Sequence, residues 1–252
     1  RYWIKDYATN VEGAITKTYP SFDYEKNDYY DMTANINVTD YDGRQYYKWD
    51  AKNNYWNGHE WDSAVPWQPV LNDGYNGDYA QITGNFYNNS GGGDKRYDAV
   101  NSCKDLPNAN EMAWYVKKGN PHWDGEEIWT TMGHLHKGGM WFKTKQSLSF
   151  TSDFNSQYGP NSFDLRASGG QVSNTPKQGT PVQNYFNRYF FVPALGYYSF
   201  GSFTNIGTKG SYWTSSAHPD DSNWAYCLTF SNSVVTLDGP DSSNGSYTMK
   251  FE

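Results

Sequence analysis

Two polar loops near the C-terminus carry the side chains best suited to binding a ligand. The first spans residues 217–223 and the second spans residues 238–245. Their carboxylate and amide oxygens accept hydrogen bonds from polar ligands, and an aromatic ring beside them offers a flat face for a sugar. The candidate binding residues are Tyr212, His218, Asp220, Asp221, Asn223, Trp224, Asp238, Asp241, Ser242 and Asn244. Ordinary solvated turns have the same composition, so the pattern leaves both interpretations open.

Calcium binding is an alternative use of the first loop. Ca²⁺ takes about six to eight oxygen ligands from closely spaced Asp, Asn or Glu side chains. Asp220, Asp221 and Asn223 supply only a few of these ligands. We therefore expect no cofactor, with Ca²⁺ as the alternative.

The spacing of three histidines is compatible with a zinc site. His134 and His136 lie two residues apart, which places both on one side of a strand and permits zinc ligation, and His122 is close in sequence. No further ligand is evident. Glycines flank the pair, so the favoured interpretation is a turn that packs against Trp129 and Trp141.

The candidates for catalytic chemistry are the two thiols and two pairs of adjacent acids. A nucleophilic thiol needs a basic neighbour, and Cys227 lies mid-strand between Tyr226 and Leu228, at a position that should point inward. Buried structural thiols, or one disulfide between them, are the favoured readings. The adjacent acid pairs at residues 126–127 and 220–221 could serve as glycosidase carboxylates, but adjacent acids are usually solvated. No catalytic constellation is present, so we expect a protein that is not an enzyme.

Composition limits the partners that the chain can bind. The 252 residues include 23 Tyr and 11 Trp, and 27 acidic against 20 basic residues give a formal net charge of −7. Nucleic-acid binding requires clustered Lys and Arg, which this balance argues against. No apolar run reaches the length of a membrane span. Tyr and Trp bury large areas but keep a polar atom, so we expect hydrogen bonds to run among the core rings. Richness in Asn, Tyr, Ser and Gly is typical of extracellular proteins, and the sequence leaves the oligomeric state open.

The loops need strands and helices to position them. Strands are predicted at residues 191–197, from Tyr212, and at residues 225–230. Asn108 and Glu111 have capping-box spacing and open a helix that ends at Gly119. Further predictions are a short helix at 96–103, a helical turn at 184–188, a hairpin around Asp42-Gly43, a long packed loop at 53–89 and a glycine-rich loop at 90–94.

The predicted organisation is one main domain with an N-terminal extension. Residues 1–40 are expected to form strands that pack on the main domain, which spans 41–252 with an insertion at about 120–180. If the strands at 224–230 and 247–251 are antiparallel neighbours, residues 234–237 lie between them. Both polar loops would then emerge on one edge of the sheet.

Several segments follow one another in the order of a known family. They are Leu-Pro-Asn-Ala-Asn-Glu before the helix, Phe-Val-Pro-Ala-Leu-Gly-Tyr at 191–197, Tyr-Trp-Thr-Ser-Ser at 212–216, Ala-Tyr-Cys-Leu-Thr-Phe at 225–230 and Tyr-Tyr-Lys-Trp-Asp at 46–50. Together they resemble the Fibrobacter succinogenes major paralogous domain, a C-type lectin-like relative of the formylglycine-generating enzyme fold. The resemblance spans roughly residues 45–252.

The resemblance implies an α+β, C-type lectin-like fold with short twisted antiparallel strands, about two helices and extensive ordered loops. Such domains are surface adhesins or fimbrial tip modules of Bacteroidetes, and variable proteins of diversity-generating retroelements. It implies an extracellular domain at the bacterial cell surface that binds a surface glycan or protein through the C-terminal loops. The alternatives are a formylglycine-generating-like or carbohydrate-active enzyme and a structural fimbrial subunit. The chain departs from the family in having no cysteine near its C-terminus to pair with Cys103.

Overall fold

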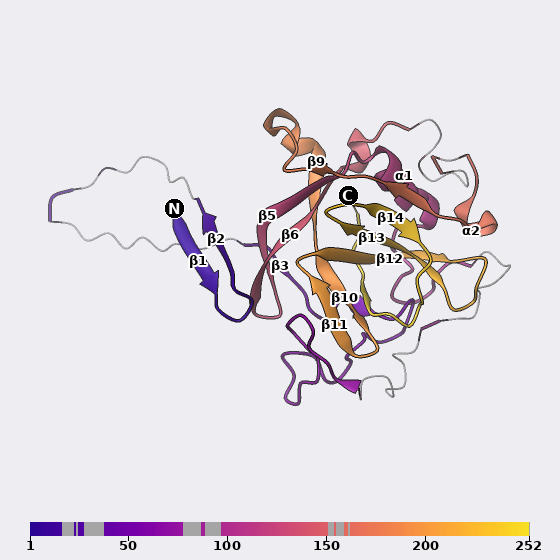
Figure 1. The fold of residues 1–252 in the computed structure, drawn as a ribbon, viewed down its shortest axis with the longest axis horizontal. Coiled ribbons are helices and arrows are strands. Elements are labelled where there is room, and N and C mark those ends of the chain that lie inside the picture. Colours follow the sequence, from indigo (N-terminus) through magenta and orange to yellow (C-terminus); the bar gives the residue numbers. More distant parts are fainter. Residues whose placement is uncertain are drawn as a thin grey trace.

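The fold consists of two mixed β-sheets, one long helix and a separate N-terminal hairpin (Figure 1). A computed structural model describes residues 1–16, 23, 25–27, 38–77, 87–88, 97–150, 154, 159–160 and 162–251. The glycine-rich loop predicted at 90–94 and most of 17–37 lie outside the described residues. The α+β class predicted from the sequence is confirmed at this level.

The larger sheet holds the strands that flank the C-terminal loops. Its order is β11-β10-β12-β13-β14-β7, and β15 pairs with both β12 and β4. The bounds are β4 (Tyr46–Tyr47), β7 (Val172–Asn174), β10 (Leu195–Ser199), β11 (Ser202–Ile206), β12 (Lys209–Ala217), β13 (Ala225–Ser231), β14 (Val235–Asp238) and β15 (Ser246–Tyr247). The strands predicted from Tyr212 and at 225–230 are therefore confirmed as parts of β12 and β13. Most pairs are antiparallel, but β12 runs parallel to both β10 and β15.

The smaller sheet is built around a long hairpin. Its strands are β3 (Asp40–Tyr41), β5 (His122–Thr131), β6 (His134–Lys143), β8 (Lys177–Gln178) and β9 (Tyr189–Pro193). The order is β3-β5-β6-β9, with β8 beside β5. Met132 and Gly133 close the hairpin with φ angles of 49° and 78°, as a two-residue turn of this hand requires. The segment predicted as an insertion thus supplies the two central strands of this sheet.

Helix α1 (Ala109–Lys118) packs between the sheets and is the element that the sequence predicts best. The Asn108 side chain accepts the Glu111 N–H at 3.0 Å, and the Glu111 carboxylate accepts the Asn108 N–H at 2.8 Å. Gly119 caps the other end, as predicted. The remaining helices are short: η2 (Lys145–Ser147), α2 (Leu165–Ser168) and η3 (Gln183–Arg188), the last confirming the turn predicted at 184–188.

The helix predicted at 96–103 is wrong for its described part, residues 97–103. The Asp50 carboxylate accepts N–H bonds from Val100, Asn101 and Cys103 at 2.6–3.3 Å. Ala99 donates its N–H to the Ser215 carbonyl at 2.7 Å. Because these donors are used by distant partners, the segment cannot also form helical bonds.

The hairpin predicted around Asp42-Gly43 is also wrong. The turn exists, with the Arg44 N–H donating to the Asp42 carboxylate at 2.9 Å. However, the strand before it, β3, pairs with β5, and the strand after it, β4, pairs with β15. The turn passes the chain from one sheet to the other. In the described part of 53–89, the predicted loop has no α-helix and no strand; it has one isolated β-bridge, at Tyr75, and a 3-10 residue, Gly77.

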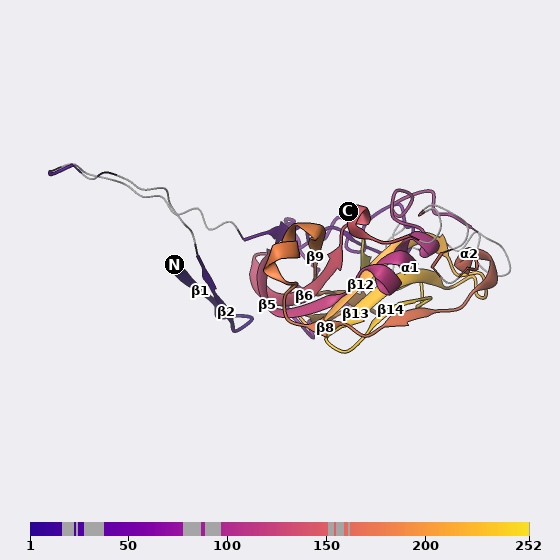
Figure 2. The ribbon, with the colours of Figure 1, turned by 90° about the horizontal axis from the view of Figure 1, so that it is seen from above.

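The N-terminal hairpin, β1 (Tyr2–Asp6) and β2 (Val11–Ile15), lies beside the main body and touches β6 (Figures 1 and 2). The Asp6 carboxylate accepts the Leu135 N–H at 2.9 Å and lies 3.0 Å from His134 Nδ1. Burial raises the pKa of Asp6, but hydrogen bonds from Leu135, Ala8, His134 and Thr9 outweigh it, and the pKa falls to about 2. The charged carboxylate therefore tethers the hairpin to the main body.

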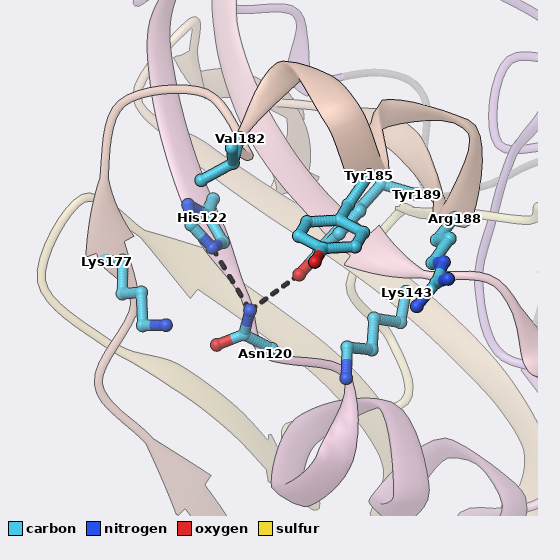
Figure 3. Close-up of a pocket in the computed structure, with 8 residues that line it drawn as sticks. All are labelled: Asn120, His122, Lys143, Lys177, Val182, Tyr185, Arg188 and Tyr189. Atoms are coloured by element: carbon cyan, nitrogen blue, oxygen red, sulfur yellow. Dashed lines mark hydrogen bonds between the residues drawn. The ribbon is translucent and has the colours of Figure 1, made fainter. Parts of the chain in front are cut away.

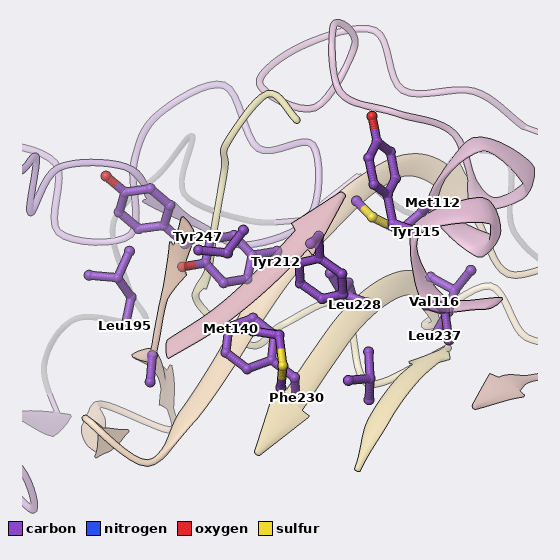
Figure 4. Packing of buried hydrophobic residues seen from close by; sticks show 14 of the residues in the cluster. Met112, Tyr115, Val116, Met140, Leu195, Tyr212, Leu228, Phe230, Leu237 and Tyr247 are labelled. Atoms are coloured by element: carbon purple, nitrogen blue, oxygen red, sulfur yellow. The ribbon is translucent and has the colours of Figure 1, made fainter. Parts of the chain in front are cut away.

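The core lies where α1 meets both sheets and is rich in aromatic rings (Figure 4). The prediction that hydrogen bonds run among the rings needs correction, because most ring donors bond to backbone carbonyls instead. The Tyr46 hydroxyl donates to Leu195, Trp49 Nε1 to Thr214, and Trp213 Nε1 to Tyr47, at 2.6–3.0 Å. Among the described residues no helix is long and apolar enough to span a membrane.

The capping box of α1 should be measurable in stability. Asn108→Ala removes the acceptor for the Glu111 N–H and is expected to lower the free energy of unfolding by about 1 kcal/mol. Asn232→Ala, at an exposed position between β13 and β14, is the matched control and should change it by less than about 0.5 kcal/mol. Urea unfolding of both variants measures the difference. Equal values would contradict the assigned cap.

Candidate ligand-binding surface

The two polar loops meet on one side of the larger sheet, as predicted, at the end where β13 begins and β14 ends. They do so because β13 and β14 are antiparallel neighbours, with Cys227 opposite Asp238. Ser242 donates its N–H to the Asn223 carbonyl at 2.8 Å, and Trp224 forms a β-bridge with Asp241. The predicted strand order was wrong: β14 lies between β13 and β7, and β15 pairs with β12 and β4.

The ten candidate residues divide by exposure. Five are exposed: Asp220, Asn223, Trp224, Asp238 and Asp241. Asp221 and Asn244 are half-buried. The other three, Tyr212, His218 and Ser242, are at most 3% exposed and cannot reach a ligand directly.

Each buried candidate has a structural role, which corrects its assignment as a binding residue. The Tyr212 hydroxyl donates to the Pro193 carbonyl, and its ring stacks on Phe230 in the core. The Ser242 hydroxyl donates to the Asn223 carbonyl at 2.6 Å and so ties the loops together. Side chains alternate between the two faces of β12, and Tyr212 lies on the face that points into the core. The composition of the following loop does not reveal which face that is.

His218 lies beneath the surface and supports it. Its ring centre is 4.6 Å from that of Tyr226 and 5.8 Å from that of Trp224. Burial lowers the pKa of His218, and the Asp220, Asp238 and Asp221 carboxylates and a Gly170 backbone bond only partly oppose this. The ring therefore packs as a neutral group beside Trp224.

The exposed acids also shape their own turns. One oxygen each of Asp221, Asp238 and Asp241 accepts a backbone N–H one or two residues further on, at 2.8 Å. Their second oxygens have no such bond to the turn. The Asp220 side chain is 63% exposed and lies 3.8 Å from His218 Nδ1. Trp224, which is 43% exposed, lies on the same pair of loops as these carboxylates and forms a β-bridge with Asp241.

Two residues next to these loops were not predicted from the sequence. The Tyr87 hydroxyl donates to the Asn223 side-chain oxygen at 2.9 Å. Lys48 is 4% exposed, and burial lowers its pKa while the Asp241 carboxylate raises it. Both come from distant segments, and no local pattern marks them. The arrangement offers an aromatic face, several acceptors and a negative local charge.

The three histidines do not form a zinc site, because His122 lies at the other end of the β5–β6 hairpin from His134 and His136. His122 pairs with Trp141 at the open end of β5 and β6, whereas His134 lies beside the closing turn. His136 stacks on Trp129 with ring centres 5.0 Å apart, and burial lowers its pKa to about 4, with His134 adding to the shift and Asp6 opposing it. Across the described ranges, no group of three or more His, Cys, Asp or Glu residues could hold a metal ion.

The acid pair at Glu126 and Glu127 and the two thiols have structural surroundings. Glu126 forms an exposed ion pair with Lys137 at 3.1 Å. Cys103 and Cys227 are both buried free thiols, not a disulfide. Burial raises the pKa of Cys103 to about 12 and that of Cys227 to about 11. Such thiols hold almost no thiolate at neutral pH, which is the form a nucleophile needs.

No protein-family model, curated protein or solved structure matches this chain. The assignment of a function therefore depends on the motifs and the geometry.

His136 should make stability depend on pH. A histidine whose pKa is lowered by folding binds protons more tightly when unfolded, so stability is lost as the pH falls below the unfolded value of about 6.5. With a folded pKa of about 4, the loss between pH 7 and pH 5 is roughly 2 kcal/mol for this residue. His136→Phe keeps the stacking on Trp129 and should remove that part of the slope. Urea unfolding at both pH values measures it, and an unchanged slope would refute the role of His136.

Proposed function

We propose that this chain is an adhesin-like, C-type lectin-like domain that binds a glycan or protein at the bacterial cell surface. The observation that carries the proposal is the exposed Trp224, which lies on one of two acidic loops that backbone bonds hold together. Aromatic stacking with surrounding acceptors is the usual way to bind a sugar. Binding of this kind needs no cofactor and no catalytic group.

The negative charge of the surface limits the class of ligand that it can bind. Four carboxylates, Asp220, Asp221, Asp238 and Asp241, lie on the two loops, and Lys48, whose pKa the Asp241 carboxylate raises, is buried. An anionic ligand would meet repulsion there, whereas hydroxyl or amine groups would find acceptors. We therefore propose a neutral or amine-bearing glycan, or a basic protein segment, as the ligand.

The loops also suit sequence diversification by a retroelement. Backbone bonds hold them, such as His218 N–H to the Trp224 carbonyl at 3.0 Å within the first loop and Ser242 N–H to the Asn223 carbonyl at 2.8 Å between the loops. Exposed side chains at 222–224 can change without removing these bonds. A reverse transcriptase gene with an imperfect template repeat of this segment downstream would support the idea. A gene neighbourhood with neither would refute it.

The raised pKa values of both thiols weigh against a formylglycine-generating-like activity. No feature of the described residues favours the structural-subunit alternative over ligand binding.

Trp224 is the residue on which binding should depend most. A glycan array probed with the intact chain identifies the ligand, and Trp224→Ala should weaken its binding about tenfold through loss of the stacked ring. Trp3→Ala, which removes a 64% exposed tryptophan from β1, is the matched control and should leave the affinity unchanged.

Two further measurements complete the test. Asp220→Asn should weaken binding of an amine-bearing ligand more than that of a neutral one, because only the charge is lost. EDTA should have no effect. If Trp224→Ala and Asp220→Asn both bind like the unaltered chain, the proposed surface is wrong.

A further inference from the structure

A second surface lies at the opposite end of α1 from the C-terminal loops. There a pocket of about 270 Å³ is lined by Lys143, Lys177 and Arg188 together with Asn120, Tyr185 and Tyr189 (Figure 3). An adjoining hollow of about 330 Å³ shares Asn120, Lys143 and Lys177 with the pocket and adds Lys117 and Lys118 from the last turn of α1. Among the residues that the structure describes, no acidic residue lines either hollow.

The backbone holds these cations together. Lys143 at the end of β6 donates its N–H to the Gly119 carbonyl, and Lys177 in β8 donates to the Pro121 carbonyl, both at 2.9 Å. The Arg188 carbonyl accepts the N–H of Thr144 at 2.8 Å. Three segments far apart in sequence are thus fixed side by side. The gathering of positive charge follows from the fold rather than from chance placement of flexible side chains.

The positive charge is not neutralised within the described part of the chain. None of the ion pairs there includes Lys117, Lys118, Lys143, Lys177 or Arg188. The positive charge also acts on the buried His122 beside the pocket. Burial lowers the pKa of His122, the charge of Lys177 lowers it further, and a hydrogen bond with the Gly179 backbone raises it. An anion bound in the pocket would relieve this repulsion.

The uncharged groups of the pocket are those that bind sugars. The Asn120 amide donates to the Tyr189 hydroxyl at 2.6 Å and lies 3.2 Å from His122 Nε2, which fixes its orientation (Figure 3). The Asn120 side-chain oxygen points toward Lys177 (Figure 3). Tyr185 is 50% exposed, and the Arg188 guanidinium lies 4.9 Å from the centre of its ring. A ring face, a fixed amide and several cations thus border one pocket.

We propose that this pocket binds an acidic saccharide, a sugar that carries a carboxylate or sulfate group. Lys143, Lys177 and Arg188 pair with the anionic group, and the Tyr185 ring stacks on the sugar. The pocket is independent of the C-terminal loops, whose negative charge selects against such ligands. Failure of one site therefore leaves the other untouched.

Calorimetric titration of the intact chain at about 50 mM NaCl tests the proposal, since low salt preserves the attraction between charges. The probes are a galacturonic acid trimer, sulfated lactose, unmodified lactose and sodium sulfate. At least one acidic saccharide should bind more tightly than lactose and sulfate, and which of the two does so identifies the acidic group. The double variant Lys143→Gln, Lys177→Gln should weaken that binding at least about tenfold. Tyr185→Ala should weaken saccharide binding and leave sulfate binding unchanged.

The matched control loses the same charge elsewhere. The double variant Lys52→Gln, Lys104→Gln removes two exposed lysines outside the pocket and should keep the affinity within about twofold. Trp224→Ala should also bind the acidic saccharide normally. The proposal is overturned if neither acidic saccharide exceeds lactose, if sulfate alone binds as tightly, or if the control loses as much affinity as the pocket variant.

Discussion

The structure depends on hydrogen bonds from buried aromatic side chains to backbone carbonyls. A buried carbonyl without a partner is costly, and loops cannot satisfy all their carbonyls from within. Here Tyr46, Tyr212 and Tyr226 donate to the carbonyls of Leu195, Pro193 and Leu165, while Trp129 Nε1 donates to Gly138. Each ring fills core volume and also ties down a neighbouring segment. This is how a chain with short strands and long loops retains a dense interior.

Strand β12 shows the consequence most clearly. All of its residues after Lys209 are buried, because β10, β13 and β15 flank it and packed side chains cover both faces. Its inward rings meet α1 and the smaller sheet, while Trp213 donates its ring N–H to the Tyr47 carbonyl at 2.7 Å. With this strand immobilised, the loop after Ala217 starts from a fixed point. Exposed side chains can then be presented without the entropy cost of ordering a free loop.

Helix α1 separates two surfaces of opposite charge. Near its first turn, the Ala109 N–H donates to the Ser216 hydroxyl at 3.1 Å, just before the acidic loop. At its last turn, Lys117 and Lys118 border the basic pocket. Negative charge at the N-terminal end and positive charge at the C-terminal end both complement the helix dipole. The helix therefore favours the same charge separation that would let the two surfaces bind different ligands.

Local sequence patterns suffice to place the capped helix α1, the strands β12 and β13, and the polar loop between them. These depend on capping residues and alternation within a few positions of each other. The tertiary structure buries Tyr212, His218 and Ser242, bonds residues 97–103 to Asp50 in place of a helix, and assigns β3 and β4 to different sheets. It alone also brought Lys143, Lys177 and Arg188 together. Side-chain direction and strand partners are set by contacts between distant segments, and the spacing of residues along the chain carries no record of those contacts.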